Sequence, residues 1–338
     1  MTDYPLKWRT LDAFDPSTCE DESNVVTRSL RAIGTTATVA VTDRSVASEA
    51  LDLLAEDLMC LDMACSRFHT DSELRLVEAA SRGTQIPISP LLFAVLEAAC
   101  AIAIQTAGIV DPTIGNALNE LGYDRDFDEI VELRIHQEVE PQPAPGWWQI
   151  RLDHEQHSVA ITEGVHIDVG ATAKAFAADR AAERISAALG CGVLVNLGGD
   201  VSLSGRPPCD GWAVGIGTHS TTPLDEVDLV LAIYSGGVAT SGTTARTWIR
   251  EGRRMHHIVD PWTGLPAEPV WSVVTTLAPT CTEANAWSTA AVVWGNDAVG
   301  NLAARGVPAR LVRADGEVVE IGGWPTATDP EPMRGMVL

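Results

Sequence analysis

Two oxygen-bearing side chains near the C-terminal end of the sequence have a spacing that suits metal binding. Asn285 and Thr289 stand four residues apart in the stretch TCTEANAWSTAAVVWG, residues 280–295. Thr280 and Glu283 form a capping-box pattern at its start, which predicts a helix. Helical residues four apart project from the same face. The pair therefore either offers oxygen ligands to a metal or makes local hydrogen bonds, and the pair alone leaves both open.

Six further polar clusters fall where strands are expected to end in turns or helices, the places where loops on a rigid scaffold carry function. Each has an ordinary explanation when taken alone: an Asp-Pro turn, an N-cap at Asp168, a solvated Lys174 or a strand histidine at His257. Together they offer glycine-rich backbone donors, a lysine, a histidine and several aspartates. The clusters are SRFHTDSE, GIVDPTIG, HIDVGATAK, NLGGD, ATSGTTAR and HHIVDPWTG.

The charge balance limits the kinds of partner that the chain can bind. Its 338 residues include 23 Lys and Arg against 46 Asp and Glu, a formal net charge of −23. This composition argues against a nucleic-acid partner or an anionic membrane surface, both of which require clustered bases. An anionic ligand would need a metal ion, helix N-termini or a few placed Lys and Arg residues to hold it.

Cysteine usage and the N-terminal sequence indicate a cytoplasmic protein. The seven cysteines are scattered without a CxxC pair, as expected for reduced thiols. The first residues lack a basic start followed by an apolar stretch, and no run is long enough to span a bilayer. We therefore expect no membrane insertion and a cytoplasmic location.

Hydrophobic patterning predicts an α+β fold with a mostly antiparallel sheet packed by long helices. A strand is expected over 31–43 and hairpins over 148–162 and 309–322, because these stretches alternate and are rich in β-branched residues. Helices are expected over 48–68, 89–108, 168–190 and 280–295. The predicted organisation is a flexible leader (1–25), a single domain with two possible subdomains (26–325) and a C-terminal tail (326–338).

The glycine-rich stretch NLGGDVSLSG does not match the common nucleotide-binding loops. It lacks the GxGxxG order of dinucleotide-binding folds and the GK[ST] ending of the P-loop. Neither of those two nucleotide-binding folds is therefore expected.

Taken in order, the motifs resemble the ApbE family of FAD-dependent flavin transferases. The resemblance rests on RAIGTTATV, CSRFHTDSEL and GIVDPTIG, followed by VHIDVGATAKAFAAD, VNLGGDVSLSG, ATSGTTAR, HHIVDPWTG and ANAWSTAAVVWG, from about residue 32 to 295. It implies an ApbE-type fold with a T-fold-like core. It also implies FAD as substrate, Mg²⁺ as cofactor, and transfer of the FMN half of FAD to a Thr or Ser hydroxyl of a partner protein, with release of AMP.

The resemblance also implies which residues contact FAD. Phe68 would place its ring near the isoalloxazine, Asp168 would bind FAD, and glycines would let the backbone approach it closely. The implied FAD-binding residues are Gly34, Thr35, Phe68, Asp111, Pro112, Thr113, Asp168, Asn196, Gly198, Gly199, Asp200, Ser241, Gly242 and Asp260.

The implied metal site departs from the family pattern at one residue. The family binds its metal through a backbone carbonyl, here that of Ala171, and through an Asp and a Thr four residues apart. Thr289 matches the Thr, but Asn285 stands in place of the Asp. An amide oxygen can bind Mg²⁺, but without the negative charge we expect weaker affinity. Glu283 points to another side of the helix, which argues against direct ligation and leaves compensation only through a water or a distorted first turn.

The implied reaction assigns two catalytic roles. A hydroxyl is a poor nucleophile, so we assign His257 as its base. Lys174 and Asp168 are expected to contact the pyrophosphate or the ribityl chain. Two rivals keep the same cavity: an Mg²⁺-dependent FAD pyrophosphatase that yields FMN and AMP, and a non-catalytic FAD-binding protein.

Overall fold

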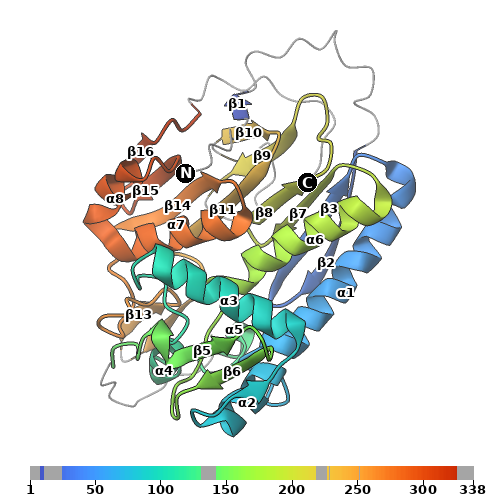
Figure 1. The fold of residues 1–338 in the computed structure, drawn as a ribbon. Coiled ribbons are helices and arrows are strands. Elements are labelled where there is room, and N and C mark those ends of the chain that lie inside the picture. The colour runs from blue at the N-terminus through green and yellow to red at the C-terminus, as the bar shows by residue number, and fades with distance from the viewer. Residues whose placement is uncertain are drawn as a thin grey trace.

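The computed structural model describes residues 8–10, 25–130, 142–217, 227, 229–250 and 252–325 (Figure 1). Of the predicted flexible leader, residues 1–7 and 11–24 lie outside the described residues, as does the predicted tail 326–338. Residues 8–10 of that leader form strand β1 (Trp8–Thr10).

The centre of the fold is an eight-stranded sheet in the order β16-β15-β14-β11-β8-β7-β3-β2. All of its neighbouring strands pair antiparallel, as the sequence predicts. Its strands are β2 (Val26–Ala32), β3 (Thr35–Val41), β7 (Val193–Leu197), β8 (Asp200–Ser204), β11 (Gly236–Gly242), β14 (Trp271–Ala278), β15 (Ala309–Arg313) and β16 (Val318–Ile321).

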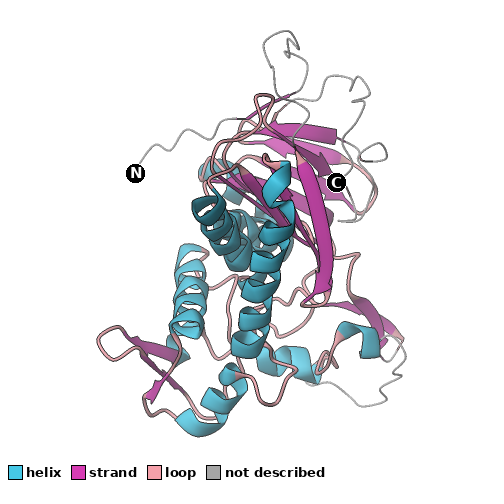
Figure 2. Ribbon diagram, turned by 90° about the vertical axis from the view of Figure 1, so that its right-hand side faces the viewer, coloured by secondary structure: helices cyan, strands magenta, loops and turns pink. Residues whose placement is uncertain are grey.

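Helices cover one face of this sheet (Figures 1 and 2). Side chains of β3 and β7 that point to this face, such as Val39 and Val195, join the core formed with Leu54, Leu58 and Ile185 of the helices. The covering helices are α1 (Ala47–Cys65), α6 (Ala173–Leu189), α7 (Cys281–Trp294) and α8 (Ala298–Ala304).

A small sheet of order β1-β10-β9 contributes to a second core on the opposite face. Trp212 and Leu231 of this sheet are buried in one cluster with Leu194, Val238 and other side chains of the main sheet. Strand β7 is therefore apolar on both sides, which explains its nearly continuous hydrophobic run. The added strands are β9 (Trp212–Ile216) and β10 (Leu229–Ile233).

The remaining elements lie below the main sheet in Figure 1 and close the lower side of the site. They comprise a three-stranded sheet of order β4-β6-β5, a β12-β13 hairpin and four helices. These elements are α2 (Glu73–Ser81), β4 (Ile86–Pro87), α3 (Pro90–Gln105), α4 (Gly115–Glu120), α5 (Phe127–Ile130), β5 (Ile150–Asp153), β6 (Ser158–Ile161), β12 (Thr247–Arg250) and β13 (Arg253–His256). Among the described residues, no helix is long and apolar enough to cross a membrane.

The predicted strand over 31–43 is wrong in one respect, because the chain reverses within it. Ile33 and Gly34 have φ angles of 44° and 68°, and Ala32 pairs with Thr35 across the resulting two-residue turn. Positive φ at both central residues is the geometry of a type I′ hairpin. The β-branched content that predicts a strand also hides this turn, since Ile at such a position is unusual.

The N-terminus of α7 is held closely by its neighbours. Thr280 Oγ1 accepts a hydrogen bond from Glu283 N at 3.1 Å, so the predicted cap is confirmed. Gly237 of β11 lies directly beneath this turn: a Cβ atom built on it would lie 2.2 Å from Cys281 N and 2.4 Å from Cys281 Cα. Glycine is required here because the obstructing atoms are backbone.

The substitution Gly237→Ala should therefore destabilise the protein. The added methyl group can be accommodated only if α7 moves away from β11, and overpacking of this kind costs about 1–3 kcal/mol. Urea unfolding measures the change. Gly300→Ala is the matched control, since it adds a Cβ in a helix where nothing lies within 4 Å. Equal unfolding midpoints for Gly237→Ala and wild type would contradict this close approach.

Candidate functional site

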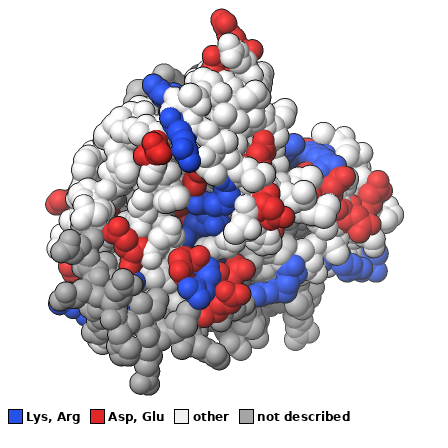
Figure 3. Space-filling model, turned by 90° about the horizontal axis from the view of Figure 1, so that it is seen from below, with Lys and Arg blue, Asp and Glu red and all other residues white. Residues whose placement is uncertain are grey.

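A cavity of about 630 Å³ lies where the ends of the main sheet and its helices meet the lower elements. This volume falls within the range of small-molecule sites. Its wall is built from the β2–β3 turn, the end of α1, the segments 109–114 and 168–174, the β7–β8 turn, the end of β11 and one face of α7. Seen from below, the molecule is hollowed near its centre, and Lys and Arg side chains lie in the hollow (Figure 3).

Most residues predicted for the site line this one cavity. They come from segments up to about 250 residues apart in sequence, so the fold brings the motifs together as the family resemblance implies. The predicted residues in the lining are Gly34, Thr35, Phe68, Asp111, Pro112, Asp168, Ala171, Lys174, Gly198, Asp200, Ser241, Gly242, His257, Asn285 and Thr289.

Four predicted residues are absent from the described lining and hold the loops behind it. Thr113 donates from both N and Oγ1 to Asp111 Oδ1, at 2.8 and 2.6 Å. Asn196 Oδ1 accepts from Gly199 N at 2.8 Å, which shapes the β7–β8 turn. Asp260 Oδ1 accepts from Trp262 N at 2.9 Å, as in an Asp-Pro turn. Their direct contact with FAD stays a prediction.

The predicted metal helix presents its two oxygens side by side. Asn285 Oδ1 and Thr289 Oγ1 lie 3.5 Å apart, and both residues are buried at the cavity wall. Asn285 Nδ2 donates to Asp200 Oδ1 at 2.8 Å, which fixes the amide so that its oxygen faces Thr289. The second oxygen of Asp200 accepts from Lys174 Nζ at 3.1 Å. Both helices of the site, α6 and α7, are thus joined through one buried carboxylate.

This donor set fits a hard cation in chemistry but is poor in charge. Amide and hydroxyl oxygens suit Mg²⁺, and Ala171 lines the same cavity. Among the described residues, Asp200 is the only carboxylate that contacts Asn285, and its charge is already shared with Lys174. In the described part of the chain, no group of three or more His, Cys, Asp or Glu side chains could hold a metal ion.

His257 lines the cavity, whereas its neighbour His256 faces the interior. His256 Nε2 lies 2.9 Å from Ala267 O, and its Nδ1 accepts from Ile258 N at 3.3 Å. The Nδ1 of His257 is buried and has no hydrogen-bond partner among the described residues. Burial, followed by the charges of Arg246 and Lys174, lowers the pKa of His257 well below 6.5. The imidazole is therefore neutral at neutral pH, the state that a general base requires.

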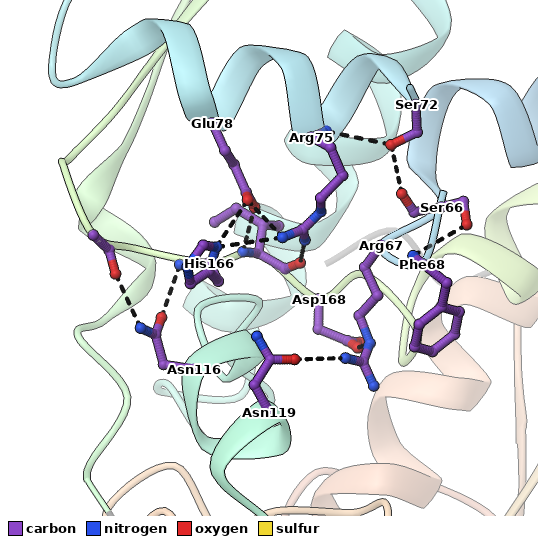
Figure 4. A network of polar contacts seen from close by, with 12 residues as sticks. Ser66, Arg67, Phe68, Ser72, Arg75, Glu78, Asn116, Asn119, His166 and Asp168 are labelled. Carbon is purple, nitrogen blue, oxygen red and sulfur yellow. Dashed lines mark hydrogen bonds and ion pairs between the residues drawn. The ribbon is translucent and has the colours of Figure 1, made fainter. Parts of the chain in front are cut away.

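Arg67 is a site residue that the sequence does not single out. Its Nε lies 2.6 Å from Asp168 Oδ2, and its Nη1 donates to Asn119 Oδ1 at 3.1 Å (Figure 4). The guanidinium carbon is 4.3 Å from the Phe68 ring centroid and 4.5 Å from that of Tyr123. The only available signal was its place beside Phe68 in the SRF motif. Arg67 thus contacts Asp168 and both aromatic rings, and holds these three side chains in place relative to one another.

The backbone that carries Asp168 is held on every side. Asn116 Oδ1 accepts from His166 N at 2.8 Å, Glu78 Oε1 accepts from Ile167 N at 2.6 Å, and Pro112 O accepts from Asp168 N at 2.8 Å. Figure 4 shows the first of these contacts, between Asn116 and His166. Asp168 Oδ1 accepts from Gly170 N at 2.7 Å rather than capping α6, whose N-cap is Thr172. The segment is therefore a rigid support for the cavity wall.

Comparison with known proteins gives a consistent result. Residues 33–327 match the sequence model of the ApbE family. The chain is 27% identical over 298 residues to the FAD:protein FMN transferase of Haemophilus influenzae, covering 84% of this chain and 85% of that protein. It is 30% identical over 283 residues to the FAD:protein FMN transferase of Treponema pallidum, covering 78% and 77%.

A solved structure shares the whole architecture. The ApbE protein of Thermotoga maritima superposes with a TM-score of 0.76 at 26% sequence identity, and the match covers 88% of this chain and 97% of that one. The α+β fold predicted from the sequence is thereby confirmed. The matched range, the relatives and the shared architecture agree, and the chain belongs to the ApbE family.

Proposed function

We propose that this protein is an FAD:protein FMN transferase, which moves the FMN half of FAD to a hydroxyl group of a partner protein. The observation that carries the proposal is the convergence of the ordered family motifs on one cavity that holds a neutral histidine and oxygen donors. The relatives with this name span most of the chain. The proposed acceptor side chain is a Thr or Ser, as the family resemblance implies.

The reaction exchanges one phosphorus–oxygen bond for another. The acceptor hydroxyl oxygen attacks the phosphorus on the FMN side of FAD, and the bond from that phosphorus to the bridging oxygen breaks. AMP leaves with the bridging oxygen, and the hydroxyl proton passes to the base. Such phosphoryl transfers depend mainly on positioning and on neutralising negative charge.

His257 is the proposed base. It is the cavity residue whose pKa is lowered well below 6.5 by burial and by neighbouring cations, so its ring is ready to accept a proton. The same cations that keep His257 neutral also favour the anionic substrate. The same positive charges therefore lower the pKa of the base and attract the phosphate group.

The start of α6 offers a second source of positive potential. Ala173 and Lys174, its first residues, line the cavity, and the N-cap residue Thr172 makes no side-chain capping bond. Free N–H groups at a helix start favour a phosphate group. Lys174 lies beside them, held by Asp200, and is the proposed contact to the pyrophosphate or ribityl chain.

Ala171, Asn285 and Thr289 are the residues that would hold Mg²⁺. When bound, Mg²⁺ would neutralise phosphate charge as a Lewis acid. Asn285 brings a neutral oxygen to this set, so affinity for the ion should be lower than in relatives with a carboxylate at this position. Asp200 holds the Asn285 amide in the orientation that binding needs.

The protein should act in the cytoplasm. The six cysteines that the structure describes are all free thiols, as expected in a reducing compartment. Two alternative functions would use the same cavity. With water as the acceptor, the protein would be an FAD pyrophosphatase; without turnover, it would be an FAD-binding protein.

A first test measures AMP release from FAD together with covalent flavin fluorescence of a threonine-bearing acceptor fragment. The transferase requires both Mg²⁺ and acceptor, so AMP and fluorescent acceptor should appear in equal amounts and disappear with EDTA. AMP released without acceptor would indicate the pyrophosphatase instead. FAD binding with no AMP under any condition would leave a binding protein only.

The variant His257→Ala should abolish transfer while leaving FAD affinity within about twofold, because a base acts on the acceptor proton and contributes mainly to rate. In wild type the rate should fall only as pH drops below 6.5, since a lowered pKa keeps the base unprotonated above that value. His154→Ala, at an exposed position, is the control. Wild-type transfer by His257→Ala would require another base.

The variant Asn285→Asp should lower the Mg²⁺ concentration for half-maximal activity by about tenfold, because it adds a charged oxygen ligand. Without metal it should unfold at a lower temperature, since the new carboxylate would lie beside Asp200. Added Mg²⁺ should therefore raise the melting temperature of the variant more than that of wild type. Glu283→Gln, in the first turn of α7, should change neither quantity. An unchanged Mg²⁺ requirement would remove Asn285 from the metal site.

A further inference from the structure

Two of the four Lys and Arg residues that line the cavity are committed to protein carboxylates. Lys174 is paired with Asp200 and Arg67 with Asp168. The other two, Arg31 and Arg246, line the same cavity, and within the described ranges their side chains form no ion pair or hydrogen bond. Arg31 is exposed, whereas Arg246 is half-buried. In a chain with a net charge of −23, a half-buried cation in a cavity wall that pairs with no carboxylate is unexpected unless a ligand pairs with it.

Arg246 lies close to the reacting part of the proposed site. One of its terminal nitrogens is 3.8 Å from the position of a Cβ built on Gly34, so the side chain reaches the β2–β3 turn. Arg246, His257 and Tyr123 all line this cavity. After burial, the charge of Arg246 contributes to the lowered pKa of His257, and it partly offsets the burial that raises the pKa of Tyr123. Asp126, a carboxylate in the same lining, forms no ion pair with it in the described structure. Arg246 is half-buried and lines the cavity.

The backbone at Arg246 is held in a conformation that favours glycine. Its φ is +47°, and the residue immediately precedes strand β12. A non-glycine residue in this region is uncommon and costs of order 1 kcal/mol. An arginine that keeps this conformation, although glycine would relieve it, indicates that its side chain is needed in the cavity.

We infer that Arg246 binds the diphosphate of FAD and holds the reacting phosphate next to His257. The inference rests on the proposed function and names a residue for it that the motif analysis left without a role. A base that takes the acceptor proton must lie next to the phosphorus under attack, so a cation near His257 is also near that phosphate. A guanidinium can donate two parallel hydrogen bonds to phosphate oxygens.

Measuring the binding of parts of FAD to the full-length protein tests whether Arg246 contacts the diphosphate rather than the flavin ring. Isothermal titration calorimetry with ADP probes the diphosphate, and riboflavin probes the flavin ring. Arg246→Gly should weaken ADP binding by about tenfold to a hundredfold, the loss expected for charge-assisted hydrogen bonds. Riboflavin affinity should not change. The ADP affinity of Arg246→Lys should lie between those of wild type and Arg246→Gly, because lysine keeps the charge but loses the fork geometry of the guanidinium.

Glycine is the decisive variant because it suits the φ angle at this position, so lost binding cannot be assigned to misfolding. Arg253→Gln, an exposed residue of β13 outside the described cavity lining, should bind ADP as wild type does. Wild-type ADP affinity in Arg246→Gly would overturn the inference, and so would an effect confined to the Michaelis constant of the acceptor. If ADP binding depends on Arg246 but no acceptor is ever flavinylated, the diphosphate site stands and the transferase proposal fails.

Discussion

The carboxylate of Asp179 joins the two helices on which the site is built. From α6, its Oδ1 accepts from Cys281 N at 2.9 Å and its Oδ2 accepts from Thr282 N at 2.9 Å, so it satisfies two free N–H groups of α7. Ser202 of β8 donates to the same carboxylate at 2.6 Å. A carboxylate at a helix N-terminus is also favoured by the helix dipole. Asn285 lies one turn beyond Cys281, so this contact sets where its amide enters the cavity.

Asp200 adds a second connection between the same helices, nearer to the cavity. It accepts hydrogen bonds from Lys174 of α6 and Asn285 of α7 and is almost fully buried. A buried carboxylate is tolerated when it is paired and hydrogen-bonded, and both oxygens of Asp200 meet that condition. Since Lys174 and Asn285 hold it from two helices, a shift of either helix leaves a buried charge incompletely paired. The site is therefore rigid, because moving either helix would cost the free energy of a buried charge without its full set of partners.

Sequence patterns were sufficient where local chemistry decides the structure. The N-cap at Thr280, the shared face of Asn285 and Thr289, and the antiparallel α+β fold all follow from periodicity and residue type. The reversal at Ile33 was missed because residue types that favour strands occupy the turn. Arg67 and Arg246 were quoted within motifs but given no role, because which cations are paired and which are free depends on carboxylates far away in sequence. Thr113 and Asp260, by contrast, occur in the family motifs but support loops rather than face the cavity.

The charges of the cavity wall form one consistent arrangement. Asn285 removes a negative charge that a carboxylate would bring, and Lys174 neutralises the nearby Asp200. Arg31 and Arg246 add positive charge that no described carboxylate pairs with. Each of these features makes the wall more favourable for a diphosphate even before a metal ion binds. After burial, the charges of Arg246 and Lys174 also lower the pKa of His257. The neutral amide of Asn285 and the unpaired Arg246 therefore act in the same direction. Under the proposed function, they would supply part of the charge neutralisation that Mg²⁺ would otherwise provide.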